Sequence, residues 1–146
     1  MVFLLKLNEQ QTRIHMKYLY LILAILCFTS RSGIAATYYV NDNSLTNDIY
    51  TSAIGNNGNT GLSPADPFAT LAFAISAAAS GDIILVDAGN YNDVNINIPN
   101  TLNNLTITGA SISTSIFDGT GASGIFLFMT IQGSNVLIEN LTITEY

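Results

Sequence analysis

The stretch after Gly81 constrains the fold more than any other part of the sequence, because short apolar runs recur there with Gly, Asn, Ser and Asp between them. Within the runs, apolar and polar residues tend to alternate with a period of two, as in strands that bury one face. Many short strands without helices between them predict an all-β body. The runs are Ile83–Val86, Val94–Ile98, Leu105–Thr108, Ile116–Phe117, Ile125–Ile131, Val136–Ile138 and Leu141–Thr144.

An internal repeat distinguishes among the all-β folds. The pentapeptide Asn-Leu-Thr-Ile-Thr occurs at 104–108 and again at 140–144, which is 36 residues later. Three strand types that recur in one order predict a three-sided parallel β-helix, a solenoid in which each turn adds one strand to each sheet. The alternatives are a coincidental repeat in a low-complexity sequence rich in Asn and Thr, and an antiparallel sandwich of similar strands. Two further pairs of runs recur about 33 residues apart, Ile83–Val86 with Ile116–Gly119 and Val94–Ile98 with Ile125–Ile131.

The repeat also predicts which residues stack. If the two pentapeptides occupy successive turns, the apolar residues of 104–108 point inward beneath those of 140–144, and the threonines form outward columns. Asn104 and Asn140 would then form an amide ladder at a corner, each side chain bonded to the next.

The segment before Gly81 predicts one strand, one loop and one helix. Thr37–Val40 is a β-branched and aromatic run, and 41–67 is dominated by Asn, Gly, Ser, Thr and Pro. Asp66 is placed to cap a helix that has Pro67 as its first residue and ends before Gly81. The apolar residues of this amphipathic helix are Phe68, Leu71, Ala72, Ile75 and Ala79.

The leading segment carries the features of a secretory signal peptide. Lys17 precedes the apolar run 18–28, and Gly33-Ile34-Ala35 places small residues at the positions of a cleavage site. The alternative is a transmembrane anchor, but the eleven apolar residues are fewer than the roughly 18 needed to span a bilayer. We therefore expect a signal peptide with an upstream extension at 1–35, no stable membrane anchor after cleavage, and a protein that is secreted or on the cell surface.

The remainder of the chain is poor in reactive side chains. Residues 36–146 contain nine acidic residues and no Lys, Arg, His, Cys or Trp, so their formal charge is −9. This composition excludes a Ser-His-Asp or Cys-His nucleophile, a zinc site of His and Cys, and an arginine clamp within that region. It also predicts no binding of nucleic acid, whose phosphates would be repelled.

Several of these segments carry a family resemblance. Residues 38–40, the run 55–71 (GNNGNTGLSPADPFATL), the helix to Ala79, and 81–91 with its Ala-Gly-Asn-Tyr turn resemble the N-terminal cap of secreted right-handed parallel β-helix proteins of the pectin lyase-like superfamily. The resemblance implies an N-terminal cap at 36–81, whose helix covers the end of the solenoid, and the first β-helix turns at 82–146. Further turns of the same chain would then follow.

The resemblance defines the activity less closely than the fold. Pectate lyases of this superfamily use Ca²⁺ with an arginine base, and polygalacturonases use clustered Asp with a nearby His; residues 36–146 lack Arg and His, so no catalytic residue is carried over. The predicted function is a capping segment of a secreted or surface scaffold that binds glycans or proteins. The alternatives are the non-catalytic front end of a polysaccharide lyase, hydrolase or epimerase whose active residues lie beyond Tyr146, and a truncated reading frame without a role.

The acidic residues at predicted turns are candidate ligands. Asp87, Asp93 and Asp118, with Asn90 and Asn92, offer the hard oxygen atoms that Ca²⁺ prefers, and they could also contact sugar hydroxyls. The alternative is ordinary turn chemistry, since Asp and Asn are common corner residues.

A second candidate site is aromatic. If alternate residues of Ile125–Ile131 face inward, beginning with Ile125, then Phe126 and Phe128 lie exposed two residues apart. An exposed aromatic pair is a stacking platform for the sugar rings of a polysaccharide or cell-surface glycan, or a docking patch. The alternative is that another part of the protein covers the pair.

Overall fold

The computed structural model of the protein describes residues 34–120 and 127–146. The chain divides into two compact units, Met1–Ile34 and Ala35–Tyr146. The predicted signal peptide lies almost wholly outside the described residues, whereas the second unit contains every strand and the helix discussed below. Within the described ranges, no helix is both long and apolar enough to cross a membrane.

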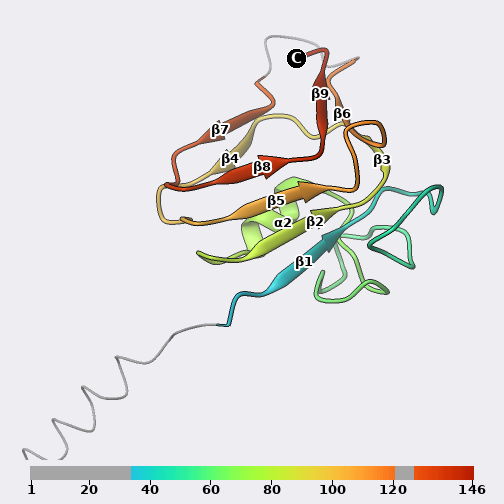
Figure 1. The fold of residues 1–146 in the computed structure, drawn as a ribbon, viewed down its shortest axis with the longest axis horizontal. Helices are drawn as coiled ribbons and strands as arrows, with labels where there is room; N and C mark the ends of the chain where they lie inside the picture. Colours follow the sequence, from blue (N-terminus) through green and yellow to red (C-terminus); the bar gives the residue numbers. More distant parts are fainter. Residues whose placement is uncertain (1–33, 121–126) are drawn as a thin grey trace, which may run out of the picture. The chain divides into compact units, whose positions relative to one another are not determined.

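The strands of the second unit form three parallel sheets (Figure 1). Every strand pair is parallel, so the alternative of an antiparallel sandwich is wrong. The first sheet has the order β1 (Thr37–Val40), β2 (Ile83–Val86), β5 (Thr106–Gly109) and β8 (Leu137–Glu139). The second has β3 (Gly89–Tyr91), β6 (Ser115–Asp118) and β9 (Thr142–Thr144), and the third has β4 (Ile96–Ile98) and β7 (Met129–Ile131).

Consecutive strands fall in different sheets in a constant order. From β2 onward the chain visits the first, second and third sheets, repeats this order with β5, β6 and β7, and then adds β8 and β9 to the first and second. The prediction of an all-β parallel body is thereby confirmed. The predicted pairing of Val94–Ile98 with Ile125–Ile131 is also confirmed, because Ile96 pairs with Met129 and Ile98 with Ile131.

The pentapeptide repeat does not stack as predicted. Its first copy contributes β5 to the first sheet, whereas its second copy contributes β9 to the second sheet. Ile107 therefore stacks between Ile84 and Ile138, while Ile143 stacks on Phe117. The segments between strands vary in length: five residues separate β5 from β6, but only two separate β8 from β9. A repeat of constant length in the sequence consequently does not correspond to a turn of the chain.

The spacing of about 33 residues between Ile83–Val86 and Ile116–Gly119 fails for the same reason, since β2 pairs with β5 and β6 pairs with β3. An asparagine contact across neighbouring turns does exist, but with another partner. Asn135 Nδ2 donates to Asn104 Oδ1 at 3.2 Å. Both residues have φ of 56°, a left-handed conformation that Asn tolerates better than most residues.

The helix α2 (Leu71–Ala77) begins later than predicted. Its N-cap is Thr70, whose side chain accepts a hydrogen bond from the Phe73 N–H. Asp66 is not the cap because Phe68 is bridged to Val40 at the edge of β1 and is therefore extended. The Asp66 carboxylate instead accepts hydrogen bonds from the backbone and side chain of Thr60.

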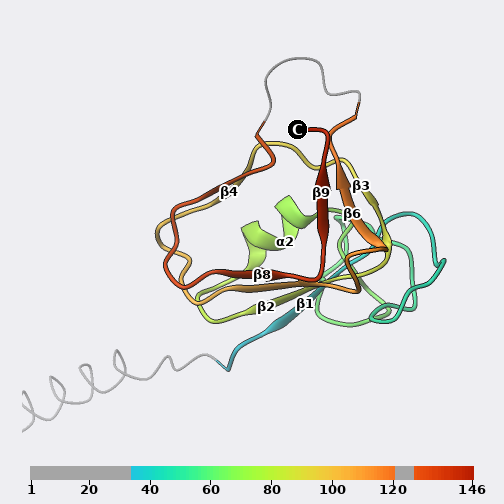
Figure 2. The same ribbon diagram turned by 45° about the horizontal axis from the view of Figure 1, so that its top comes forward.

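The helix packs against strands at one end of the first and third sheets. Leu71, Ala74 and Ile75 are its buried residues, and the helix contacts β1, β2 and β4. Figure 2 shows α2 within the outline that the strands trace. Beyond it, inward side chains of all three sheets form one core. Its fully buried apolar members include Val40, Ile84, Val86, Ile98, Leu105, Ile107 and Phe117.

Candidate functional site

Asp87 lies just after β2 and binds a loop rather than a ligand. Its side chain is completely buried. The carboxylate accepts backbone hydrogen bonds from Ile49 at 2.8 Å, Tyr50 at 2.9 Å and Thr51 at 2.6 Å. It also accepts from the Thr51 hydroxyl at 2.8 Å and the Ala88 N–H at 2.9 Å. These five donors occupy its oxygen atoms and anchor the loop after β1 to the end of β2.

The side chain of Asp93, which follows β3 in the sequence, lies beside the first residues of α2. Its carboxylate oxygens accept hydrogen bonds from the N–H groups of Leu71, at 3.4 Å, and Ala72, at 3.2 Å. Such N–H groups have no partner within a helix, so the carboxylate supplies acceptors where the helix lacks them. Burial raises the pKa of Asp93 above its usual value of 3.8, and the two hydrogen bonds oppose that rise.

The raised pKa of Asp93 predicts a pH dependence of stability. The folded protein holds this proton more tightly than the unfolded chain, so ionisation costs stability as the pH rises from 3.8 through the folded pKa. In the variant Asp93→Asn the side-chain amide does not ionise, but it keeps one oxygen that can accept a hydrogen bond. We expect the free energy of unfolding of Asp93→Asn, minus that of the wild type, to increase between about pH 3 and about pH 7 in urea titrations. A difference that is constant or falls with pH would contradict the burial argument.

Asp118 is the third predicted calcium ligand, and its only hydrogen bonds in the described residues are local. The carboxylate accepts from the backbone and hydroxyl of Thr120, and these bonds lower its pKa. Asp87, Asp93 and Asp118 thus serve three separate sets of donors. Nowhere in residues 34–120 and 127–146 do three His, Cys, Asp or Glu side chains lie in a group that could hold a metal ion. The structure does not bring the predicted Ca²⁺ ligands together.

The predicted aromatic platform is wrong for Phe128, and Phe126 lies outside the described residues. The Phe128 side chain is only 8% exposed. Its ring packs against Phe117, with centroids 5.0 Å apart, and against Tyr146 at 5.3 Å. The prediction assumed one unbroken strand over 125–131, but β7 begins only at Met129. Phe128 precedes that strand, so its ring enters the core while Leu127 is 62% exposed.

A polar groove that the sequence did not reveal lies between the loop after β1 and the strands β3 and β6. Its volume is about 330 Å³. We call it the loop–sheet groove. It is lined by Asp42, Ser44, Thr46, Asn47, Ala88, Gly89, Asn90, Ser113, Thr114 and Ile116. Among these residues, only Asn90 was predicted from the sequence as a candidate ligand, because the loop and the sheet are brought together by tertiary contacts alone.

Two features hold the loop wall of this groove in place. Asn41 is buried, and its amide donates to Ser44 O, Asp48 Oδ2 and Ala53 O at 3.1, 2.7 and 3.0 Å. Asp42 accepts from the N–H groups of Ser44 and Asn90. The carboxylate lies so close to the sheet that a Cβ at position 89 would come within 2.7 Å of it, so glycine is needed there. Together with the hydrogen bonds that Asp87 accepts, these contacts hold the loop wall of the groove in position without a ligand.

The groove presents polar atoms that remain available. Asn90 and Ser113 donate from their backbone N–H groups, to Asp42 and Ser111, and within the described residues their side chains make no hydrogen bond. The side chain of Asn47 is likewise exposed. Beside these groups, the half-buried Ile116 and the buried Ala88 provide a small apolar surface. The groove therefore combines amides, a hydroxyl and a carboxylate with an aliphatic wall.

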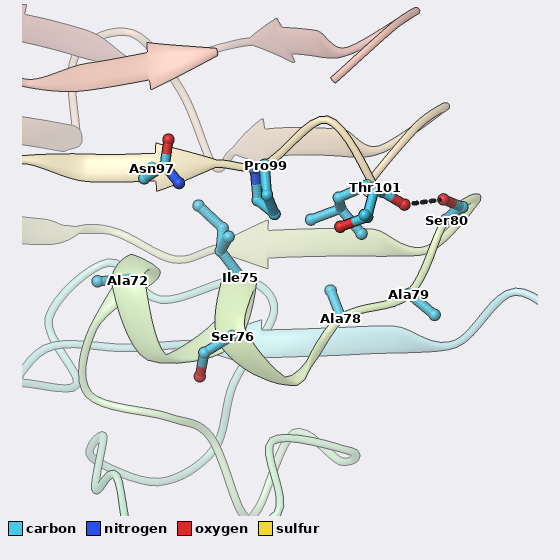
Figure 3. Close-up of a pocket in the computed structure, with 10 residues that line it drawn as sticks. Ala72, Ile75, Ser76, Ala78, Ala79, Ser80, Asn97, Pro99 and Thr101 are labelled. Carbon is cyan, nitrogen blue, oxygen red and sulfur yellow. Dashed lines mark hydrogen bonds between the residues drawn. The ribbon is translucent and has the colours of Figure 1, made fainter. Parts of the chain in front are cut away.

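A second hollow, the helix groove, has a volume of about 470 Å³ and lies between α2 and the segment after β4 (Figure 3). Ile75 points from the helix toward Pro99, and the Ser80 hydroxyl donates to Thr101 O at 3.1 Å near one end. None of the described residues that line this hollow has an ionisable side chain, so they offer no group for acid–base chemistry. Its lining consists of Ala72, Ile75, Ser76, Ala78, Ala79, Ser80, Asn97, Pro99, Thr101 and Leu102.

Comparison with known proteins gives no match: no protein-family model, curated protein or solved structure matches the chain. The resemblance to the pectin lyase-like superfamily therefore rests on the quoted residues alone.

Proposed function

We propose that the unit Ala35–Tyr146 is the capped start of a right-handed parallel β-helix in an exported protein, and that it serves as a scaffold that binds neutral glycans in the loop–sheet groove. Three observations support the fold: every strand pair is parallel, the sheets are visited in a constant order, and α2 packs against strands at one end of the first and third sheets. Right-handed connections between parallel strands are strongly preferred, which supports the handedness. Export is supported by the signal-like sequence at 17–35.

The chemistry of the loop–sheet groove carries the glycan proposal. A sugar offers hydroxyls that both donate and accept, together with an apolar face of C–H groups. The amides of Asn47 and Asn90 and the hydroxyl of Ser113 can each donate and accept. Ile116 supplies an aliphatic surface beside them. Because the loop wall is already anchored by Asn41 and its neighbours, little ordering would be needed on binding.

Charge narrows the class of glycan. Asp42 lines the groove, and no Lys or Arg occurs after Arg31. An anionic polymer would be repelled by the carboxylate and by the acidic unit as a whole. The Asp42 carboxylate can, in contrast, accept hydrogen bonds from neutral sugar hydroxyls, and bonds to a charged group are stronger than those between neutral groups. The proposal is therefore specific for uncharged oligosaccharides.

The proposal is tested on a glycan array, followed by calorimetric titration of the best neutral oligosaccharide. We expect Asn90→Ala and Ser113→Ala each to weaken binding about five- to tenfold, because each removes about one net hydrogen bond. The matched controls are Ser76→Ala and Asn97→Ala, which alter an exposed hydroxyl and an exposed amide in the helix groove.

If the control variants lost as much glycan affinity as the other two, the result would indicate that the glycan binds in the helix groove, and it would contradict the proposal. Absence of any neutral ligand, or binding of acidic glycans only, would also contradict it. Thermal unfolding of each variant verifies that weaker binding is not caused by loss of the fold.

A further inference from the structure

Two acidic side chains hold the loop after β1, but they receive very unequal numbers of hydrogen bonds. Asp87 accepts five, three of them from consecutive backbone N–H groups of the loop. Asp48, a partly buried residue of the loop itself, accepts only at Oδ2, from the Asn41 amide at 2.7 Å and the Thr51 hydroxyl at 3.4 Å. Among the buried side-chain nitrogen and oxygen atoms of the described residues, Asp48 Oδ1 alone has no hydrogen-bond partner.

Neither donor to Asp48 can serve this carboxylate fully. The Asn41 amide nitrogen carries two hydrogens, but two backbone carbonyls of the loop, at 3.1 and 3.0 Å, compete for them with Asp48 Oδ2. The Thr51 hydroxyl carries one hydrogen, and Asp87 Oδ2, at 2.8 Å, lies nearer to it than Asp48 Oδ2 does. This part of the loop therefore has more acceptors than hydrogens. The shortage falls on Asp48, where a buried charged acceptor without a partner is costly.

A proton bound to Asp48 would supply the missing hydrogen. A protonated carboxyl group has one O–H donor and keeps the capacity to accept. From Oδ2, the new hydrogen can be donated to the Thr51 oxygen, whose own hydrogen is donated to Asp87. Hydrogen bonds would then run without interruption from the loop through Thr51 to the end of β2. Protonation also removes the negative charge that is shared with the unpartnered Oδ1.

The surroundings of Asp48 favour its protonated form. Burial raises the pKa of Asp48 above its usual value of 3.8, and the negative charges of Asp87 and Asp42 also raise it, while hydrogen bonds from two side chains oppose the rise. Residues 35–146 contain no Lys, Arg or His that could offset these charges. Tyr91, whose hydroxyl donates to Asp87 O, stays neutral because burial raises its pKa as well.

We propose that Asp48 is a pH-sensitive anchor for the loop wall of the loop–sheet groove, so that the protein holds this wall more firmly and binds its glycan more tightly at mildly acidic than at neutral pH. The effect on glycans rests on the proposed function, whereas the effect on the loop does not. Asp48 directly follows Asn47, which lines the groove and has a φ of 66°. A loop that is less firmly held has to be ordered on binding, which weakens affinity.

Proton linkage gives the direction of the effect. The folded protein holds the proton of Asp48 more tightly than the unfolded chain, so the stabilisation is fully present below pH 3.8 and is lost as the pH rises through the folded pKa. Burial raises the pKa of Asp93 too, so this residue contributes in the same direction. A comparison of the wild type with Asp48→Asn separates the two, because Asp93 is unchanged. The asparagine does not ionise, and its N–H₂ group can donate to Thr51 as the protonated carboxyl would.

The first test is amide hydrogen exchange of Ile49, Tyr50 and Thr51, measured by NMR and expressed as protection factors relative to an unstructured peptide at the same pH. In the wild type we expect these factors to fall at least about threefold between about pH 4 and about pH 7, and in Asp48→Asn clearly less. The carboxyl carbon of Asp48 should titrate over the same pH range. The matched control is Glu139→Gln, which removes an exposed carboxylate from β8 and should keep the pH dependence of the wild type.

The second test is calorimetric titration of the same proteins with the neutral oligosaccharide selected on the glycan array. We expect the dissociation constant of the wild type to increase at least about threefold between about pH 4 and about pH 7. In Asp48→Asn the increase should be clearly smaller, because the side chain at position 48 keeps a donor at every pH. Glu139→Gln should again behave like the wild type.

Three results would overturn the proposal: an Asp48 carboxyl carbon that titrates at or below pH 3.8, loop amides whose protection does not change with pH, or equal pH dependence in the wild type and Asp48→Asn. Circular dichroism establishes that each variant is folded. If Asp48→Asn is not, the joint titration of the Asp48 carbon and the loop amides in the wild type decides. Absence of any neutral ligand would refute the glycan part together with the proposed function, whereas the exchange data would still decide whether Asp48 anchors the loop.

Discussion

Replacing Asp87 with alanine is expected to lower the free energy of unfolding by about 4 kcal/mol. The carboxylate is completely buried and accepts hydrogen bonds from three consecutive backbone N–H groups, those of Ile49, Tyr50 and Thr51. Without it, these three N–H groups lose a charged acceptor. A hydrogen bond to a charged group contributes about 1.5–3 kcal/mol, and three are lost together.

Urea titration followed by circular dichroism measures this effect. Asp118→Ala is the matched control, because among the described residues its carboxylate accepts hydrogen bonds from Thr120 alone, and its loss should change stability by less than about 0.5 kcal/mol. Asp87→Asn should fall between the two, since the amide keeps one acceptor oxygen but turns an N–H₂ group toward other donors. A loss of less than about 1 kcal/mol in Asp87→Ala would show that the loop does not depend on this residue.

Phe117→Ala is expected to cost about 3–5 kcal/mol. The Phe117 ring is completely buried and lies between two other aromatic rings, with centroids 5.0 Å from both Tyr91 and Phe128. Removing it forfeits the transfer free energy of the ring and leaves a cavity. It also removes two aromatic contacts, each worth about 0.5–1.5 kcal/mol beyond area.

Stability to urea again provides the measurement. Ile116→Ala, next in the same strand but directed outward and only half-buried, should cost clearly less. If the two substitutions were equally costly, the assignment of inward and outward residues in β6 would be wrong. The same assignment explains why Phe128 is unsuited to stacking on a sugar, because its ring completes this aromatic cluster.

Much of the secondary structure could be predicted because it follows from local patterns. Thr37–Val40 and Ile83–Val86 are strands as predicted, since β-branched and aromatic residues there are bounded by turn residues. The helix was also predicted, but not its first residue. Asp66 and Pro67 carry the local signal of a helix start, which the pairing of Phe68 with β1 overrides.

The candidate sites were less predictable because each depends on which distant residues meet. The aspartates that resembled metal ligands hold a loop, a helix start and a turn, and they do so with backbone N–H groups that carry no sequence signal. The loop–sheet groove joins Asn47 to Asn90 and Ser113 across three segments. No spacing along the chain indicates that these side chains share one surface.

The sequence by itself determined the class of fold and the chemical character of this protein. Alternating apolar residues require strands with a buried face, and the absence of Lys, Arg, His and Cys after residue 35 limits its chemistry to carboxylates, amides and hydroxyls. The tertiary structure alone decided the register. Two identical pentapeptides occupy different sheets because unequal loops set where each strand begins, and long-range strand pairing then decides which side chains are buried.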